Sequence, residues 1–328
     1  MELITGENDD DRRLDRILRK ALPDYPLPLI HRLLRQRKIL INGKPGKASD
    51  RIKSGVKIFI PISHSAHPTP LSPLPSPSFS KLKILWENND LIAINKPSGI
   101  SVHGGKSLDT IVRAFLADKL PPSLSFTPGP LHRLDKPTSG IVIFSKSIEG
   151  ARIFSTLMRE KKIKKTYLAV VKGYIKTEEI WRDELVRDKE KKKTFVLSKK
   201  LIKSKNVNNE IPKIAVTKIT PLSSDGSLTL IAAQIETGRT HQIRAQAASH
   251  GFPLLGDVKY GAGNAEQRAE SNKKADIFLH AWRLEFLDVF IEAVLPQTWI
   301  PIASRIASTN VLRSGSLPEI PGISTNSG

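Results

Sequence analysis

Residues 129–147 read GPLHRLDKPTSGIVIFSKS and place a single carboxylate, Asp135, between an Arg-Leu pair and a Thr-Ser-Gly turn. The apolar run behind the turn, IVIFSK, has the length and β-branched composition of a buried strand. Asp135 therefore lies on a turn that leads directly into the core. The sequence around this stretch decides which chemistry such a carboxylate serves.

Strand-like and helix-like segments alternate on both sides of this stretch. KILWENNDLIAINKP, TYLAVVKG and LTLIAAQIE favour strands, whereas SLDTIVRAFLADKL and GARIFSTLMREKK favour amphipathic helices. The segments do not follow a regular βαβ rhythm. They predict an α+β domain built on a mixed, mainly antiparallel sheet rather than a doubly wound fold.

Composition limits the classes of function. The chain has 328 residues, with 52 Lys and Arg against 32 Asp and Glu, a net charge of +20. The electrostatic field of such a positive protein attracts polyanions, of which RNA and DNA are the commonest inside cells. The absence of cysteine excludes disulfides, cysteine-ligated zinc and a thiol nucleophile. No run reaches the roughly 18 apolar residues of a membrane span, and the first residues lack an apolar signal core, so we expect a cytoplasmic protein with no membrane partner.

The N-terminal segment, residues 12–61, predicts a compact basic module. Apolar residues at helical spacing indicate one helix over residues 14–22 and a second over residues 29–37. KILINGKP then predicts a strand and a turn at Asn42-Gly43, and GVKIFIP a closing strand. The segment resembles the S4 RNA-binding domain, a small α/β domain that places a paired-helix basic surface on structured RNA. The resemblance implies RNA contacts by the basic residues of the second helix, Arg32, Arg35 and Arg37.

Composition also predicts the domain boundaries. Residues 1–62 form the S4-like domain, and the Pro- and Ser-rich residues 63–80 form an extended linker. Residues 81–304 form the second domain. Residues 305–328 lack an apolar period and are expected to be a mobile tail.

A partner for Asp135 is predicted in ETGRTHQIRAQAASHG, residues 236–251. Thr240 is the expected N-cap of a helix on which Ile243 faces the core, while His241 and Arg244 share another face. An arginine paired with Asp135 would keep the carboxylate ionised, as a nucleophile or a base requires. A purely structural Arg-Asp pair remains an alternative.

Other chemistries lack their usual residues. Leu134 separates Arg133 from Asp135, unlike the H-R-D-L loop of protein kinases, and neither a Gly-rich phosphate loop nor a D-F-G motif occurs. The histidines are scattered and show no H-E-x-x-H pattern, so no metal site is predicted. No second acid in a similar setting supports hydrolysis by paired carboxylates.

Taken together, the motifs resemble the RluA-type pseudouridine synthases, isomerases that convert uridine to pseudouridine in RNA. NKPSG occupies residues 95–99, H-R-L-D-x-x-T-S-G residues 132–140 and K-x-Y residues 165–167; G-R-T-H-Q-I-R follows at residues 238–244 and FLH at residues 278–280. The resemblance covers residues 81–300, in the order and spacing of the family. An upstream S4 domain also occurs in members of this family.

The resemblance assigns roles residue by residue. Asp135 matches the catalytic aspartate, Tyr167 the tyrosine that stacks on the target base, and Arg244 the arginine that pairs with the aspartate. Arg133 would displace or replace the flipped nucleotide. The remaining expected substrate or RNA contacts are His132, Arg239 and His241.

The resemblance also implies the substrate and the cofactor requirement. SVHGG at residues 101–105, with the S4-like module, is similar to the RluC branch, which acts on large-subunit (23S) ribosomal RNA. The target uridine must be flipped out of the folded RNA, and the isomerisation needs no cofactor or metal. We expect a monomer. Two alternatives stay open: a pseudouridine synthase for transfer RNA, and a non-catalytic RNA-binding or ribosome-assembly factor.

Overall fold

The computed structural model describes residues 1–61, 82–197, 211–261 and 277–309. The predicted linker at residues 63–80 lies outside the described residues, as does residue 310 onward. The predicted start of the tail at residue 305 is wrong. Helix α8 (Ile300–Ser308) continues through that point and buries Ile306 completely, because its apolar side packs against strands β14 (Lys213–Ser224) and β15 (Leu228–Ile235) of the main sheet.

The N-terminal module has the predicted two helices and small sheet. Its larger sheet has the order β1-β6-β3-β4, and β2 pairs separately with β5. The turn at Asn42-Gly43 is confirmed, since both residues adopt the positive φ that a tight hairpin requires. The elements are β1 (Glu2–Ile4), η1 (Glu7–Asp9), β2 (Arg12–Arg13), α1 (Leu14–Ala21), α2 (Leu27–Arg35), β3 (Leu40–Ile41), β4 (Lys44–Pro45), β5 (Arg51–Ile52) and β6 (Lys57–Phe59).

The second domain is an α+β unit on a mixed, mainly antiparallel sheet, as predicted. The described strands follow the order β13-β12-β14-β15-β11-β16-β10-β8-β7, with β17 beside β16 and β9 beside β10. The β10–β16 pair is parallel, and the other pairs are antiparallel. The elements are β7 (Ile84–Glu87), β8 (Leu91–Lys96), α3 (Leu108–Leu116), β9 (Gly129–Pro130), β10 (Ser139–Ser145), α4 (Ile148–Arg159), β11 (Lys164–Lys172), β12 (Glu179–Asp188), β13 (Lys193–Val196), β14 (Lys213–Ser224), β15 (Leu228–Ile235), α6 (Gln242–Ser249), β16 (Leu279–Phe286), β17 (Val289–Glu292), η2 (Gln297–Trp299) and α8.

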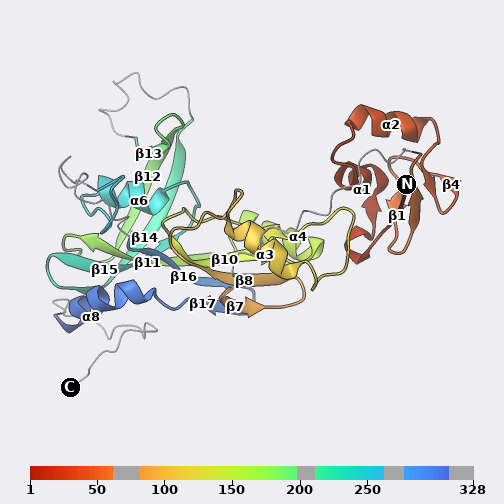
Figure 1. The fold of residues 1–328 in the computed structure, drawn as a ribbon. Coiled ribbons are helices and arrows are strands. Elements are labelled where there is room, and N and C mark those ends of the chain that lie inside the picture. The colour runs from red at the N-terminus through yellow and green to blue at the C-terminus, as the bar shows by residue number, and fades with distance from the viewer. Residues whose placement is uncertain (62–81, 198–210, 262–276, 310–328) are drawn as a thin grey trace.

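Helices cover both faces of this sheet (Figure 1), which explains why its central strands are apolar without alternation. Along β10, Val142 and Phe144 pack with α3, whereas Ile141 and Ile143 pack with α4. Further along the sheet, α6 packs on one face of β11 and β15, and α8 packs on the other. Tyr167 of β11 contacts both the α3 cluster and the α6 cluster. It therefore lies on the sheet face between these two helices.

The Thr-Ser-Gly turn at residues 138–140 requires a glycine at its last position, Gly140. Its φ of 112° lies in the region that favours glycine, and a Cβ there would lie 2.2 Å from the carbonyl oxygen of Ala281. Gly140 comes this close to Ala281 because β10 and β16 pair in parallel here, Ser139 with His280 and Gly140 with Ala281. His280 receives a hydrogen bond from Ser139 Oγ at its Nδ1 (2.8 Å) and donates from Nε2 to the Ala293 carbonyl (3.3 Å). The FLH motif thus fixes the point where the Asp135 turn enters the sheet.

The two domains are joined by a buried carboxylate. Asp9 of the N-terminal module is fully buried and accepts hydrogen bonds from the Ser123 hydroxyl (2.8 Å), the amides of Leu124 and Ser125 (both 2.9 Å) and the Ser125 hydroxyl. Burial opposes ionisation of Asp9, but these hydrogen bonds prevail and its pKa is lowered. Gly6 touches the same loop, since a Cβ there would lie 1.9 Å from the Pro122 carbonyl oxygen. The module is therefore docked through a specific polar contact.

The substitution Asp9→Ala should undock the N-terminal module from the second domain. It leaves buried donors of the 123–125 loop without an acceptor, at a cost of about 1–3 kcal/mol. Small-angle X-ray scattering should show a larger radius of gyration, and the exposed-site control Asp24→Ala should scatter like the wild type. Identical scattering by all three proteins would contradict this account of docking.

Candidate active site

The turn that carries Asp135 is held by the NKPSG segment, residues 95–99. Lys96 is fully buried and donates to the carbonyls of Pro97 (3.0 Å), Ile100 (2.8 Å) and Lys136 (3.2 Å). The amide of Gly99 also donates to the Lys136 carbonyl, at 2.9 Å. Burial lowers the pKa of Lys96 to about 8, against the opposing effect of the Asp135 charge. The turn is therefore fixed by a lysine that does not itself line the cavity into which Asp135 opens, described below.

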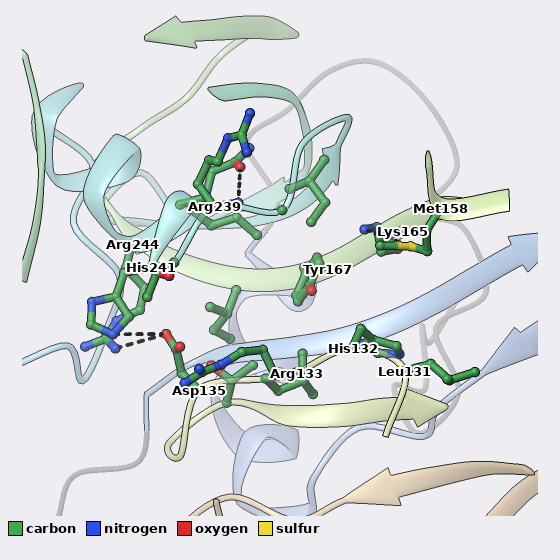
Figure 2. A pocket seen from close by; sticks show the side chains of 18 residues that line it. Leu131, His132, Arg133, Asp135, Met158, Lys165, Tyr167, Arg239, His241 and Arg244 are labelled. Carbon is green, nitrogen blue, oxygen red and sulfur yellow. Dashed lines mark hydrogen bonds and ion pairs between the residues drawn. The ribbon is translucent and has the colours of Figure 1, made fainter. Parts of the chain in front are cut away.

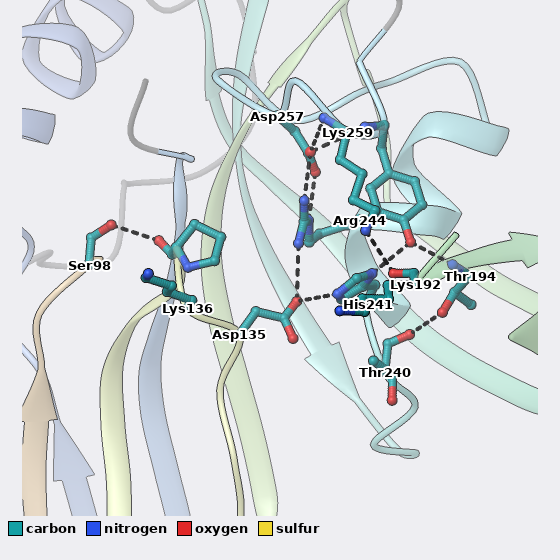
Figure 3. A network of polar contacts seen from close by, with 12 residues as sticks. Ser98, Asp135, Lys136, Lys192, Thr194, Thr240, His241, Arg244, Asp257 and Lys259 are labelled. Atoms are coloured by element: carbon teal, nitrogen blue, oxygen red, sulfur yellow. Dashed lines mark hydrogen bonds and ion pairs between the residues drawn. The ribbon is translucent and has the colours of Figure 1, made fainter. Parts of the chain in front are cut away.

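Arg244 of α6 joins Asp135 to a second carboxylate (Figure 3). Its Nε and Nη2 each donate to one oxygen of Asp257 at 2.8 Å, a bidentate pair, while Nη1 donates to Asp135 Oδ2 at 3.3 Å. The Asp257 side chain is 0% exposed. Burial alone would lower the pKa of Arg244, but Asp257 and then Asp135 outweigh it and raise that pKa. One cation thus pairs with two carboxylates and holds Asp135 and Asp257 on either side of the same guanidinium group.

His241 contributes a neutral ring to the same group. Its Nδ1 lies 2.8 Å from the Tyr260 hydroxyl, which accepts from the Thr194 amide, and its Nε2 lies 3.6 Å from Asp135 Oδ2. The pKa of His241 is lowered to about 4, because burial and nearby cations including Arg244 outweigh the opposing effect of the Asp135 charge. At neutral pH the Tyr260 hydroxyl can donate to Nδ1, which leaves the Nε2–H facing the carboxylate.

Helix α6 is fixed by buried amides. Gln242 donates to Thr217 Oγ1 at 2.9 Å and accepts from the Arg239 amide at 3.0 Å. Thr217 Oγ1 in turn donates to Gln246 Oε1 at 2.7 Å. Because these polar groups are buried and paired, Arg244 starts from a rigid position.

Asp135 opens into a cavity of about 280 Å³ (Figure 2). Its other walls come from β11, β15, β16, α4, α6 and the loop 238–241. Tyr167 and Lys165 of β11 line the cavity, with Lys165 at the end away from Asp135, and the Lys165 amine contacts Met158 Sδ at 3.7 Å. Burial, with the charge of Asp135, raises the pKa of Tyr167, so its phenol is neutral. Burial also lowers the pKa of Lys165. The cavity therefore combines an aromatic side chain, a carboxylate and a cation, which suits one planar polar ring.

His132 belongs to the wall of this cavity but has a structural contact. Its Nε2 accepts from the Ile143 amide at 3.1 Å, and its ring stacks on Phe154 at a centroid distance of 6.1 Å. Burial, together with the charge of Lys165, lowers the pKa of His132 to about 3. The ring is therefore a neutral hydrogen-bond acceptor that holds the segment before the Asp135 turn against β10.

Comparison with known proteins agrees with this geometry. Residues 90–249 match the family model described as RNA pseudouridylate synthase, and residues 12–58 match the S4 domain. Ribosomal large subunit pseudouridine synthase C from Buchnera aphidicola subsp. Acyrthosiphon pisum is 31% identical over 84% of this chain and 86% of its own length. The chain belongs to the RNA pseudouridylate synthase family.

Other relatives agree. Ribosomal large subunit pseudouridine synthase D from Neisseria meningitidis serogroup A is 30% identical over 84% of this chain and 71% of its own. The solved structure of human RNA Pseudouridylate Synthase Domain Containing 4 matches with a TM-score of 0.53 and 24% identity, over 66% of this chain and 89% of that one. The structural match supports the fold.

The pseudouridylate synthase pocket brings together most of the predicted site residues. Seven of the ten line the Asp135 cavity: His132, Arg133, Asp135, Tyr167, Arg239, His241 and Arg244. The three others, on the N-terminal module, do not line it. All three are exposed, and Arg35 and Arg37 line a separate hollow of about 730 Å³ with Lys47.

The expectation that Thr240 caps α6 is wrong. The helix begins at Gln242, and His241 occupies the N-cap position with a left-handed φ of 55° and no side-chain cap. This conformation is uncommon for a residue with a side chain. It is maintained here because the His241 ring is bound by Tyr260 and Gln242 is fixed by β14.

Several site residues of this pseudouridylate synthase did not emerge from the sequence. Asp257 and Tyr260 lie in LLGDVKYG, residues 254–261, beyond the helix that carries Arg244. An aspartate shortly after a Leu-Leu pair, at the end of a helix-turn segment, is the only signal they offered. The Thr138 hydroxyl, 2% exposed and lining the cavity, has no hydrogen-bond partner among the described residues. It is available to a polar atom of a bound ring.

Replacing His132 with Gln should reduce acid sensitivity. The folded pKa of about 3 lies below the unfolded value of 6.5, so stability is complete above pH 6.5 and falls as the pH drops toward 3. Urea unfolding, followed by fluorescence of the buried Trp181, Trp282 and Trp299, should show that wild type loses stability on acidification more steeply than His132→Gln, by up to about 1.4 kcal/mol per pH unit. His103→Gln, at an exposed position, is the control. Parallel curves for wild type and His132→Gln would contradict the neutral-acceptor assignment.

Proposed function

We propose that this pseudouridine synthase isomerises uridine in large-subunit ribosomal RNA, with Asp135 as the catalytic carboxylate. The observation that carries the proposal is the Asp135 carboxylate, held by Arg244 at 3.3 Å at the edge of a cavity lined by Tyr167. The relatives named ribosomal large subunit pseudouridine synthases C and D support the substrate, as does the S4 domain.

The reaction breaks the bond from N1 of uracil to C1′ of the ribose and forms a bond from C5 to C1′. The C5 proton leaves, and N1 takes up a proton, so no electrons are gained or lost. Asp135 either adds to the uracil ring or assists departure of the base from C1′, and both routes release the C5 hydrogen. In either route Arg244 holds the carboxylate at one position beside the cavity.

The neighbouring residues take the remaining roles. Tyr167 stacks on the uracil ring, and its raised pKa makes it a neutral hydroxyl rather than a phenolate base. Arg133 and Arg239 at the mouth of the cavity contact the RNA around the flipped nucleotide, which costs a few kcal/mol to extrude. His241 and His132 hold their loops through Tyr260 and Ile143 respectively.

Location and assembly complete the proposal. Among the described residues, no helix is long and apolar enough to cross a membrane. The chain contains no cysteine, which fits a reducing compartment, and we propose a cytoplasmic monomer acting on RNA. Light scattering on the purified protein measures the oligomeric state, and a mass near 36.4 kDa is expected.

The test is tritium release from large-subunit ribosomal RNA labelled at C5 of its uridines. Wild type should release tritium, and Asp135→Asn should lose at least about 10³-fold of the rate, because it removes the reacting group. Asp118→Asn, an exposed control, should react like the wild type. Release from transfer RNA but not from ribosomal RNA would overturn the substrate, and an active Asp135→Asn would overturn the mechanism.

A further inference from the structure

A second cavity, of about 640 Å³, lies between the N-terminal module and the catalytic domain. Residues of α1, α3 and α4 line it together with the loop that binds Asp9. Five of the lining residues carry a positive charge and none is acidic; the cations are Arg12, Lys20, Arg113, Arg152 and Arg159. None of them lines the Asp135 cavity. We call this group the interdomain cleft.

Much of this charge is not neutralised within the protein. Arg113 pairs with Asp109 at 2.8 Å, and Arg152 approaches Glu149 at 3.7 Å with both side chains exposed. In the described part of the chain, no ion pair joins Arg12, Lys20 or Arg159 to a carboxylate. Cations gathered in this way repel one another unless an anion binds among them.

Arg12 shows that the cleft is organised rather than a random basic surface. Its Nη1 donates to the carbonyl and the hydroxyl of Ser125, both at 2.9 Å, across the domain boundary. Burial, with the charges of Arg152 and Arg16, lowers the pKa of Arg12 despite Asp9. A half-buried arginine is therefore held among like charges by the same loop that docks the module.

The docking contacts fix the two walls of the cleft. Asp9 binds the 123–125 loop, Leu124 packs against the core of the module, and the Asn8 side chain accepts from the Ile148 amide at the start of α4 at 2.9 Å. The cleft therefore exists as a unit only while the module is docked.

The lining also supplies hydroxyl groups. Thr127 and Thr156 line the cleft beside the cations, whereas the Ser125 and Ser155 hydroxyls, also in the lining, donate to Asp9 and to the Ala151 carbonyl. Hydroxyls and guanidinium groups are the side chains that bind phosphate oxygens of nucleic acids. Because the cations are spread over three helices and strand β2, in two domains, they match a series of phosphates rather than one small anion.

We propose that the interdomain cleft binds backbone phosphates of the RNA substrate away from the target uridine. The proposal rests on the RNA substrate of the proposed function and adds a second contact surface to it. Its residues contact phosphates and not bases, so they increase affinity without selecting the uridine. The N-terminal module then acts as one wall of a shared binding surface.

The test compares Arg152→Gln/Arg159→Gln with a matched control, Lys172→Gln/Arg182→Gln, which removes the same charge from exposed positions on β11 and β12. The affinity of each full-length protein for a large-subunit ribosomal RNA fragment is measured over a range of KCl concentrations. The cleft variant should bind about tenfold more weakly near physiological salt, and its slope of log affinity against log salt should be smaller by about 1.4. The single-turnover rate at saturating RNA should be unchanged.

Three outcomes decide the matter. If the cleft variant matches the control in affinity and slope, the proposal is wrong. If calorimetry shows inorganic phosphate binding that depends on Arg152 and Arg159 while RNA affinity does not, the cleft is a small-anion site and the proposal is also wrong. If the cleft variant loses RNA affinity although wild type releases no tritium, the cleft stands and the proposed substrate falls.

Discussion

The pair between Arg244 and Asp257 is the contact on which the site depends. A single hydrogen bond of 3.3 Å from Arg244 would hold Asp135 loosely, but two bonds of 2.8 Å to Asp257 fix the guanidinium plane before substrate arrives. The Asp257 side chain has no exposed surface, so removing the arginine would leave a buried charge uncompensated. The arginine therefore positions Asp135, the proposed catalytic carboxylate, and stabilises a second, buried carboxylate at the same time.

The sheet delivers the two halves of this site to one place. Asp135 precedes β10 and Arg244 follows β15, and strands β11 and β16 lie between them in the sheet. Lys96 and the Ser139–His280 bond fix the first half, and the buried amides of Gln242 and Gln246 fix the second. Tyr167 lies on β11 between them. Because the site is preorganised in this way, the free-energy cost of ordering its side chains is met when the protein folds and not during the reaction.

Much of this arrangement could be predicted from the sequence because local signals were strong. The helices and the Asn42-Gly43 turn of the N-terminal module, and the pairing of Asp135 with Arg244, follow from helical spacing, turn chemistry and motif resemblance. The N-cap of α6 could not be predicted, because contacts with Tyr260 and β14 override the local preference of Thr240. The continuation of α8 past residue 304 could not be predicted either, because its burial against β14 and β15 depends on residues that are distant in the sequence.

The partners that the sequence did not reveal are distant contacts. Asp257 lies 13 residues after Arg244, and Asp9 meets Ser125 across 116 residues. Isolated carboxylates of this kind carry no periodic or motif signal, and only the folded chain shows which cation or amide each one faces. The same holds for the interdomain cleft, whose cations come from three separate helices and the strand before the first of them.

The most direct measurement is the single-turnover rate of Asp257→Asn on C5-tritiated RNA, with RNA affinity measured in parallel. The introduced amide would keep one acceptor oxygen but lose the charge and the bidentate geometry. We expect the rate to fall about 10²-fold with unchanged RNA affinity, and Asp225→Asn, where the lost partner is the surface residue Arg305, to react like the wild type. A folded Asp257→Asn protein with the wild-type rate would contradict the claim that this pair positions Asp135.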